Sequence, residues 1–124
     1  MAFSSENASY EDRRRWPRLN AYSPVKFRCI NEDKFQCCIT CDISEGGAGV
    51  LLDHPVPRGT CLYFQIKLHN CPRPAYGIAR VVWTDRDNYS DKYRTGLEFL
   101  EISSTSRTDI ASFVQTGITP PHPS

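Results

Sequence analysis

The sequence predicts a mainly β domain, an antiparallel sandwich or barrel, with one α-helix near its C-terminal end. Short runs of alternating apolar and polar residues are separated by turn residues, and one segment repeats apolar residues at helical spacing. The chain has 124 residues, of which 40% are hydrophobic and 23% charged. These values describe one ordinary domain that is large enough to bury a core.

Six strands are predicted from these runs, and each is bounded by residues that favour turns. The predicted strands cover 25–29, 35–43, 48–52, 62–68, 77–83 and 94–100. In the second strand the odd-numbered positions, from Phe35 to Ile43, are expected to form one apolar face. Closely spaced strands of this kind indicate antiparallel pairing.

The helix is predicted from Thr105 to Gly117. Either Ser104 or Thr105 is expected to cap its N-terminus, and Gly117 its C-terminus. Its apolar stripe is expected to consist of Ile110, Phe113 and Val114.

Both ends of the chain are predicted to lie outside the domain, which we assign to residues 13–118. Residues 1–12 are polar and form a flexible tail, and residues 119–124 form a proline-rich tail. The first residues lack the apolar region of a secretory signal, and no stretch is long and apolar enough to span a membrane. We therefore expect a cytoplasmic protein without a membrane span.

The six cysteines raise the possibility of a metal site, because Cys38 and Cys41 have the C-x-x-C spacing of zinc ligands. Residues three apart in a strand point to opposite faces, and the sequence has no second such pair. We therefore expect reduced cysteines that pack as small apolar side chains, and no bound metal. A metal or redox site at Cys38 and Cys41 remains an alternative.

No residue can be given a catalytic role, so we expect a protein that is not an enzyme. The three histidines lie beside turns or in the tail, and no nucleophile-elbow pattern is present.

Two short polar segments attract attention instead. Residues 13–18, RRRWPR, place four arginines within six positions of a chain whose net charge is only +1. Residues 41–52, CDISEGGAGVLL, contain a glycine-rich turn without the pattern of a P-loop or a dinucleotide fingerprint. The glycines allow positive φ angles or the close approach of a ligand. Alternatively, Asp42 and Ser44 satisfy amides of their own turn.

Taken together, the two segments resemble the motifs of the PilZ domain family. Arg14 and Arg18 match an R-x-x-x-R motif, and Asp42, Ser44 and Gly47 match a D-x-S-x-x-G motif that follows it. The segments GIARVVW and YRTGLEFLEI, at 77–83 and 93–102, look like later strands of the same family. The resemblance covers about residues 12 to 116.

The resemblance implies a six-stranded antiparallel β-barrel with a C-terminal helix, and a receptor for the bacterial second messenger cyclic di-GMP. Arginine forks suit guanine edges and phosphates, and a carboxylate suits guanine N–H groups. Glycine at position 47 allows a ligand to lie against the backbone, and Trp83, at a strand end, provides a stacking wall or packs in the core. The expected ligand-binding residues are Arg13, Arg14, Arg15, Arg18, Asp42, Ser44, Gly47 and Trp83.

The ligand is expected to bind as one molecule or as an intercalated pair, and to order a loose arm of residues 1–20 against the barrel. This conformational change would then transmit the signal to an unidentified effector protein (signal transduction). One alternative is a PilZ-fold interaction adaptor that binds no nucleotide. Another is a barrel that binds single-stranded nucleic acid, which the nearly neutral charge disfavours, so no nucleic-acid partner is expected.

Overall fold

The computed structural model describes residues 17–118, which form seven strands and one helix. All six predicted strands and the predicted helix are present. A further strand of two residues pairs next to them. The elements are β1 (Leu19–Asn20), β2 (Pro24–Cys29), β3 (Gln36–Ile43), β4 (Gly47–Leu52), β5 (Cys61–Ile66), β6 (Ala75–Arg86), β7 (Tyr93–Ile102) and α2 (Ser104–Ile118).

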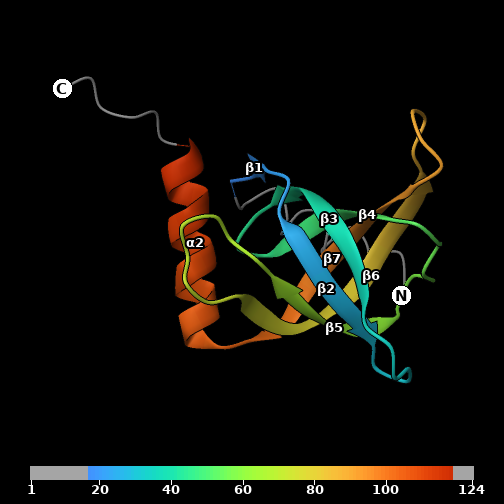
Figure 1. Ribbon diagram of the computed structural model, residues 1–124, viewed down its shortest axis with the longest axis horizontal. Coiled ribbons are helices and arrows are strands. Elements are labelled where there is room, and N and C mark those ends of the chain that lie inside the picture. Colours follow the sequence, from blue (N-terminus) through green and yellow to red (C-terminus); the bar gives the residue numbers. More distant parts are fainter. Residues whose placement is uncertain (1–16, 119–124) are drawn as a thin grey trace, which may run out of the picture.

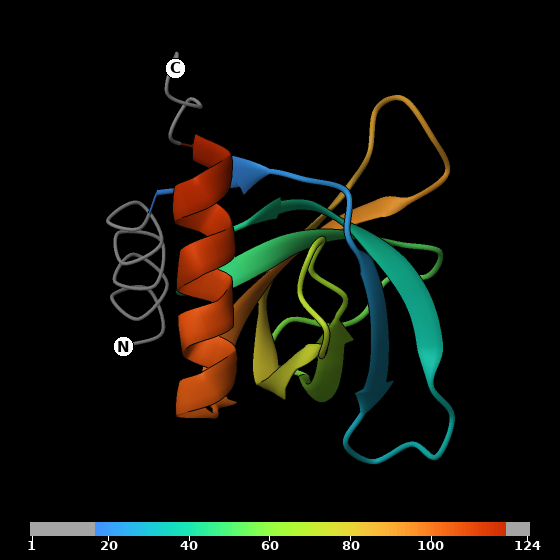
Figure 2. The same cartoon turned by 60° about the vertical axis from the view of Figure 1, so that its left-hand side comes forward.

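Six of the strands close into an antiparallel barrel in the order β3-β2-β5-β6-β7-β4, with β4 pairing back to β3. Closure confirms the predicted six-stranded barrel and distinguishes it from a sandwich. The short strand β1 pairs with the end of β3, with Leu19 opposite Ile43 and Asn20 opposite Asp42. Figures 1 and 2 show α2 along one side of the barrel, opposite the projecting loop between β6 and β7.

The core fills the inside of the barrel with the inward side chains of every long strand. In β2 the pattern is regular, because Val25, Phe27 and Cys29 are buried while Pro24 and Lys26 are exposed. Burying one large aliphatic or aromatic side chain contributes roughly 1.5–3 kcal/mol. The largest fully buried hydrophobic side chains are Phe64, Ile43, Leu62, Ile66, Leu68, Ile110, Val50, Val81 and Val114.

The predicted apolar face of β3 is wrong for the first half of the strand. Cys37 and Ile39 are exposed, whereas Thr40 is fully buried and Ile43 is fully buried as well. A β-bulge between Thr40 and Asp42 explains the change, because one extra residue reverses the alternation. The inward face therefore switches from even to odd positions at Cys41.

The helix keeps its predicted stripe but not its predicted caps. Ile110 and Val114 are buried, and Phe113 packs against the core. The N-cap is Ser103, whose hydroxyl accepts a hydrogen bond from the Ser106 amide at 3.1 Å, one residue earlier than expected.

Gly117 lies inside the helix and does not end it. A Cβ atom at this position would lie 2.4 Å from a Leu19 methyl carbon, so the missing side chain makes room for β1. The helix thus contacts the barrel through its stripe and contacts β1 through this glycine.

Candidate functional site

One row of residues crosses the outer surface of five strands. Asn20 pairs with Asp42, Asp42 with Gly49, Gly49 with Gly96, and Gly96 with Trp83. Paired residues of neighbouring strands share a face of the sheet. The next row, Ile43, Ala48, Leu97 and Val81, is buried in the core, so the first row faces outward. We call the first row the glycine row.

Two β-bulges turn Asp42 and Trp83, both predicted site residues, outward. In a regular strand, residues two apart share a face. Thr40 is nevertheless buried and Asp42 lies outside, because the bulge at Cys41 separates them. The same happens in β6, where a register shift between Val81 and Trp83 leaves Val81 in the core and Trp83 on the surface. Bulges of this kind commonly re-aim side chains at binding sites.

The two glycines of the row form a floor beneath the neighbouring side chains. A Cβ atom on Gly49 would lie 3.1 Å from a carboxylate oxygen of Asp42, and one on Gly96 would lie 2.1 Å from the indole nitrogen of Trp83. The Gly49 amide also donates a hydrogen bond of 3.1 Å to Asp42. The Asp42 side chain therefore covers Gly49, and the Trp83 side chain covers Gly96 from the opposite direction.

This arrangement differs from the expectation for Trp83. The residue is not at a strand end, because β6 continues to Arg86. Its indole is half-buried, packs against Gly96 on the outer surface, and is not part of the barrel core. Sequence reasoning missed Gly49 and Gly96, although a glycine inside a strand often marks close approach of another group.

The turn that contains Ser44 and Gly47 is held by hydrogen bonds among its own residues. The Ser44 side chain is buried, and its hydroxyl donates to the Gly47 carbonyl at 3.2 Å and accepts from the Gly46 amide at 3.3 Å. A Cβ atom at Gly47 would lie 2.0 Å from the Leu97 carbonyl oxygen, so close packing against β7 requires glycine there. The expected positive φ angles are absent from these glycines; among the described residues the only glycine with one is Gly59.

The described part of the arginine cluster lies beside the glycine row. Arg18 is exposed and directly precedes β1, and it forms no ion pair with other described residues. Arg13, Arg14 and Arg15 lie outside the described residues. The arm was expected to be loose up to residue 20, but Leu19 and Asn20 are paired with β3. The attachment point of the arm is therefore fixed next to Asp42.

The cysteines are free thiols in the described residues. Burial raises the pKa of Cys38 to about 12, and burial followed by the nearby Asp42 carboxylate raises the pKa of Cys41. Thiols with raised pKa values are poor nucleophiles and poor metal ligands near neutral pH. Between residues 17 and 118, no group of three or more histidine, cysteine, aspartate or glutamate side chains could hold a metal ion.

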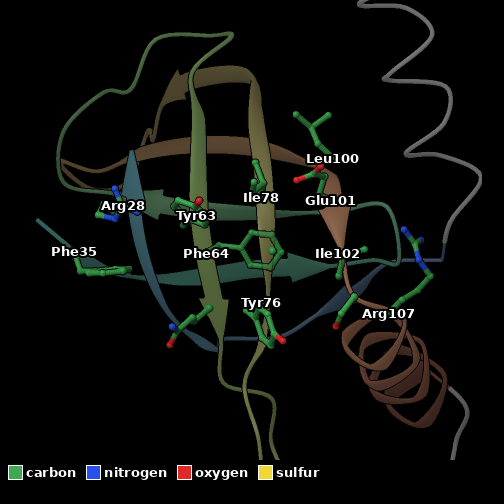
Figure 3. A pocket seen from close by; sticks show the side chains of 13 residues that line it. Arg28, Phe35, Tyr63, Phe64, Tyr76, Ile78, Leu100, Glu101, Ile102 and Arg107 are labelled. Carbon is green, nitrogen blue, oxygen red and sulfur yellow. The ribbon is translucent and has the colours of Figure 1, made fainter. Parts of the chain in front are cut away.

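A cavity of about 610 Å³ lies on a different face of the barrel. Figure 3 shows that its side chains come from β2, β5, β6, β7 and the start of α2. Arg18, Asp42, Ser44, Gly47 and Trp83, the expected binding residues that the structure describes, do not line it. Its rim carries exposed aromatic rings, and the Arg28 guanidinium lies 4.7 Å from the centre of the Tyr63 ring. This surface, which we call the aromatic face, includes Arg28, Phe35, Tyr63, Tyr76, Leu100 and Arg107.

The model of the PilZ domain family matches residues 12–116. The chain belongs to the PilZ domain family. The match includes the glycine row and also the arginine cluster, so both predicted motifs lie within the matched residues. No curated protein gives a significant match to the chain.

Solved PilZ-type structures share the fold at low sequence identity. A TM-score of 0.73 and 22% identity relate the chain to the Bacillus subtilis inhibitor of motility, MotI/DgrA, over 83% of this chain. This chain spans about half the length of that protein, 50%. The PilZ domain of Escherichia coli YcgR, solved with c-di-GMP, gives a TM-score of 0.64 and 17% identity over 85% of this chain and 91% of its own.

A third structure is the PilZ domain of CeSA from a cellulose-synthesizing bacterium, with a TM-score of 0.60 and 19% identity. The likeness covers 80% of this chain and 95% of that one. In the described part of this chain, no helix has the length and apolar character needed to cross a membrane.

Proposed function

We propose that this protein is a receptor for cyclic di-GMP that binds the nucleotide on the glycine row and the adjoining arginine arm. The observation that carries the proposal is the placement of Asp42 and Trp83. Two bulges turn both side chains onto one outer row, over glycines that keep the surface flat. An aromatic ring and a carboxylate side by side are suited to a planar purine with N–H donors on its edge.

The residue roles follow from the chemistry of the ligand, which has two guanines and two phosphates. Asp42 accepts hydrogen bonds from guanine N–H groups, and Trp83 stacks on a base or closes one side of the site. Ser44 and Gly47 shape the turn that holds Asp42, in keeping with their internal contacts. The arm supplies cations for guanine edges and phosphates from Arg13, Arg14, Arg15 and Arg18.

Binding would order the arm against the barrel from its attachment at β1. Because Leu19 and Asn20 are already paired, only the chain before them needs to be ordered. This lowers the entropic penalty that charge-assisted contacts must exceed. The ordered arm then presents a new surface to an effector protein. Such a shift requires the ligand to prefer the ordered state.

Isothermal titration calorimetry tests the proposal. We expect the wild-type protein to bind cyclic di-GMP saturably and GTP weakly, and the stoichiometry to distinguish one nucleotide from an intercalated pair. Arg14→Ala and Asp42→Asn should each weaken binding about tenfold or more, because charged hydrogen bonds contribute roughly 1.5–3 kcal/mol. Asp42→Asn keeps an oxygen that accepts from the Gly49 amide, so the turn is preserved.

Asp91→Asn is the matched control, because Asp91 is an exposed carboxylate in the loop between β6 and β7, away from the glycine row. This variant should bind like the wild type. A folded wild-type protein that gives no binding heat at high micromolar nucleotide would refute the receptor proposal.

The second candidate is a protein-interaction adaptor, and the aromatic face is the observation that favours it. Tyr63 is 41% exposed, Phe35 50% and Tyr76 55%, and all three border one cavity. Grouped exposed apolar side chains often mark protein-interaction surfaces. The double variant Tyr63→Ser, Tyr76→Ser separates the two surfaces. We expect it to bind cyclic di-GMP normally, whereas a loss equal to that of Asp42→Asn would place the nucleotide on the aromatic face.

A further inference from the structure

Arg94 lies on the outer surface next to the glycine row. It is two residues before Gly96 on β7, so both positions face the same side. The distance between such positions is about 7 Å along a strand. Arg94 pairs with Leu51 of β4 and Asp85 of β6, which form the neighbouring outward row. Its side chain is therefore within reach of a ligand that lies against Trp83.

The charge of Arg94 is not neutralised by another described residue. Its guanidinium contacts the thiol of Cys41, and no ion pair joins it to a carboxylate between residues 17 and 118. Arg80, which flanks the same surface, differs because it donates to Glu98 at 2.6 Å. Of these two arginines, only Arg94 is without an ion pair among the described residues, with the Asp85 carboxylate as its cross-strand neighbour.

Arg94 and Arg18 lie on opposite sides of the glycine row. Along β1 the chain runs from Arg18 to Asn20, so Arg18 is on the side where β7 carries Glu98. Arg94 is on the other side of Gly96. Asp42, with its carboxylate, lies between the two flanks. A flat ligand that lies against Asp42 and Trp83 would thus have a cation at each flank and a hydrogen-bond acceptor in the middle.

We propose that Arg94 is a further binding residue, which holds a phosphate of the nucleotide from the flank opposite the arginine arm. The inference rests on the proposed receptor function. A ligand with two phosphates on a rigid ring presents negative charge on two sides, and this matches two separated cations. The Arg94 guanidinium contacts the thiol of Cys41, the bulge residue that directly precedes Asp42, so the cation lies close to the glycine row.

Calorimetric titration of Arg94→Gln, Arg94→Lys and wild-type protein with cyclic di-GMP tests the proposal. We expect Arg94→Gln to weaken binding about tenfold. Arg94→Lys should stay within about threefold of the wild type, since an ammonium group still satisfies a phosphate. The dependence of affinity on salt should also be shallower for Arg94→Gln, because one cation–phosphate contact is lost.

Arg107→Gln is the control, since it removes the same charge from α2, beside the aromatic face. It should bind like the wild type with an unchanged salt dependence. Wild-type affinity in Arg94→Gln would overturn the role of Arg94 and leave the receptor function standing. Equal losses in Arg94→Gln and Arg94→Lys would overturn the phosphate contact. Absence of binding by the folded wild type would refute the receptor function itself and this inference with it.

Discussion

Single bulge residues determine which face of the sheet carries the side chains of Asp42 and Trp83. Cys41 and the position between Val81 and Trp83 are the extra residues of two bulges; if these segments were regular strands of the same sequence, Asp42 would share the inward face of Thr40, and Trp83 that of Val81. The motif residues were recognisable in the sequence because their types and spacing are distinctive. The bulges were not, because an inserted residue changes the alternation only relative to a partner strand, which the sequence does not display.

Gly96 is predicted to be required by the indole of Trp83. Gly96→Ala would place a Cβ atom 2.1 Å from the indole nitrogen, so we expect an overpacking loss of about 1–3 kcal/mol in unfolding free energy and weaker nucleotide binding. Denaturant unfolding of the single variants Gly96→Ala and Trp83→Ala and of the double variant tests whether contact with the indole causes the loss. In a Trp83→Ala background, Gly96→Ala should have little effect on stability. An undiminished loss in that background would mean that the strain arises from another contact.

At the level of elements, the hydrophobic pattern was sufficient to locate six strands and the helix, because each element buries part of its surface in the core. It could not reveal β1, since Leu19 and Asn20 are too few to show a period. The helix caps, which were predicted from residue types, were also wrong. Several serines and threonines lie at the start of the helix, and only the hydrogen bond that the Ser103 hydroxyl accepts from the Ser106 amide identifies Ser103 as the N-cap. Gly117 looked like a C-cap because sequence alone cannot show that Leu19 packs against it.

The N-cap of α2 can be tested with two adjacent serines. Ser103→Ala removes the acceptor of the Ser106 amide and should lower the unfolding free energy by about 1 kcal/mol. Ser104→Ala changes a neighbouring exposed serine and should change the unfolding free energy by no more than about 0.5 kcal/mol. Thermal or urea unfolding measures both. A larger loss from Ser104→Ala than from Ser103→Ala would reverse the assignment of the cap.

At the level of the whole molecule, β1 connects the proposed ligand surface to the helix. Asn20 pairs with Asp42 on the outside, while Leu19, the adjacent residue, packs against Gly117 of α2. Adjacent residues of a strand point to opposite sides, so one two-residue strand touches both regions. Anything that holds Asn20 more firmly on β3 also holds Leu19 more firmly on the helix.

We predict that nucleotide binding slows amide hydrogen exchange in the last turns of α2 as well as in β3. The stabilised pairing of β1 would reduce local opening of the helix end next to Gly117. Exchange measured by mass spectrometry with and without cyclic di-GMP tests this. Leu19→Ala should abolish the effect on α2 and keep the effect on β3. Protection confined to β3 in the wild type would show that the helix is not coupled to the site.

The glycine row also has a consequence for folding. Its members come from segments as far apart as Asn20 and Gly96, and they meet only when β4 pairs with both β3 and β7. Contacts of such long sequence separation form late in antiparallel barrels, because the loops between them must close first. Neither the first nor the second half of the chain contains the row. If the protein is the proposed receptor, a chain that is only partly synthesised or partly unfolded would not bind the nucleotide, and bound ligand would stabilise only the closed barrel.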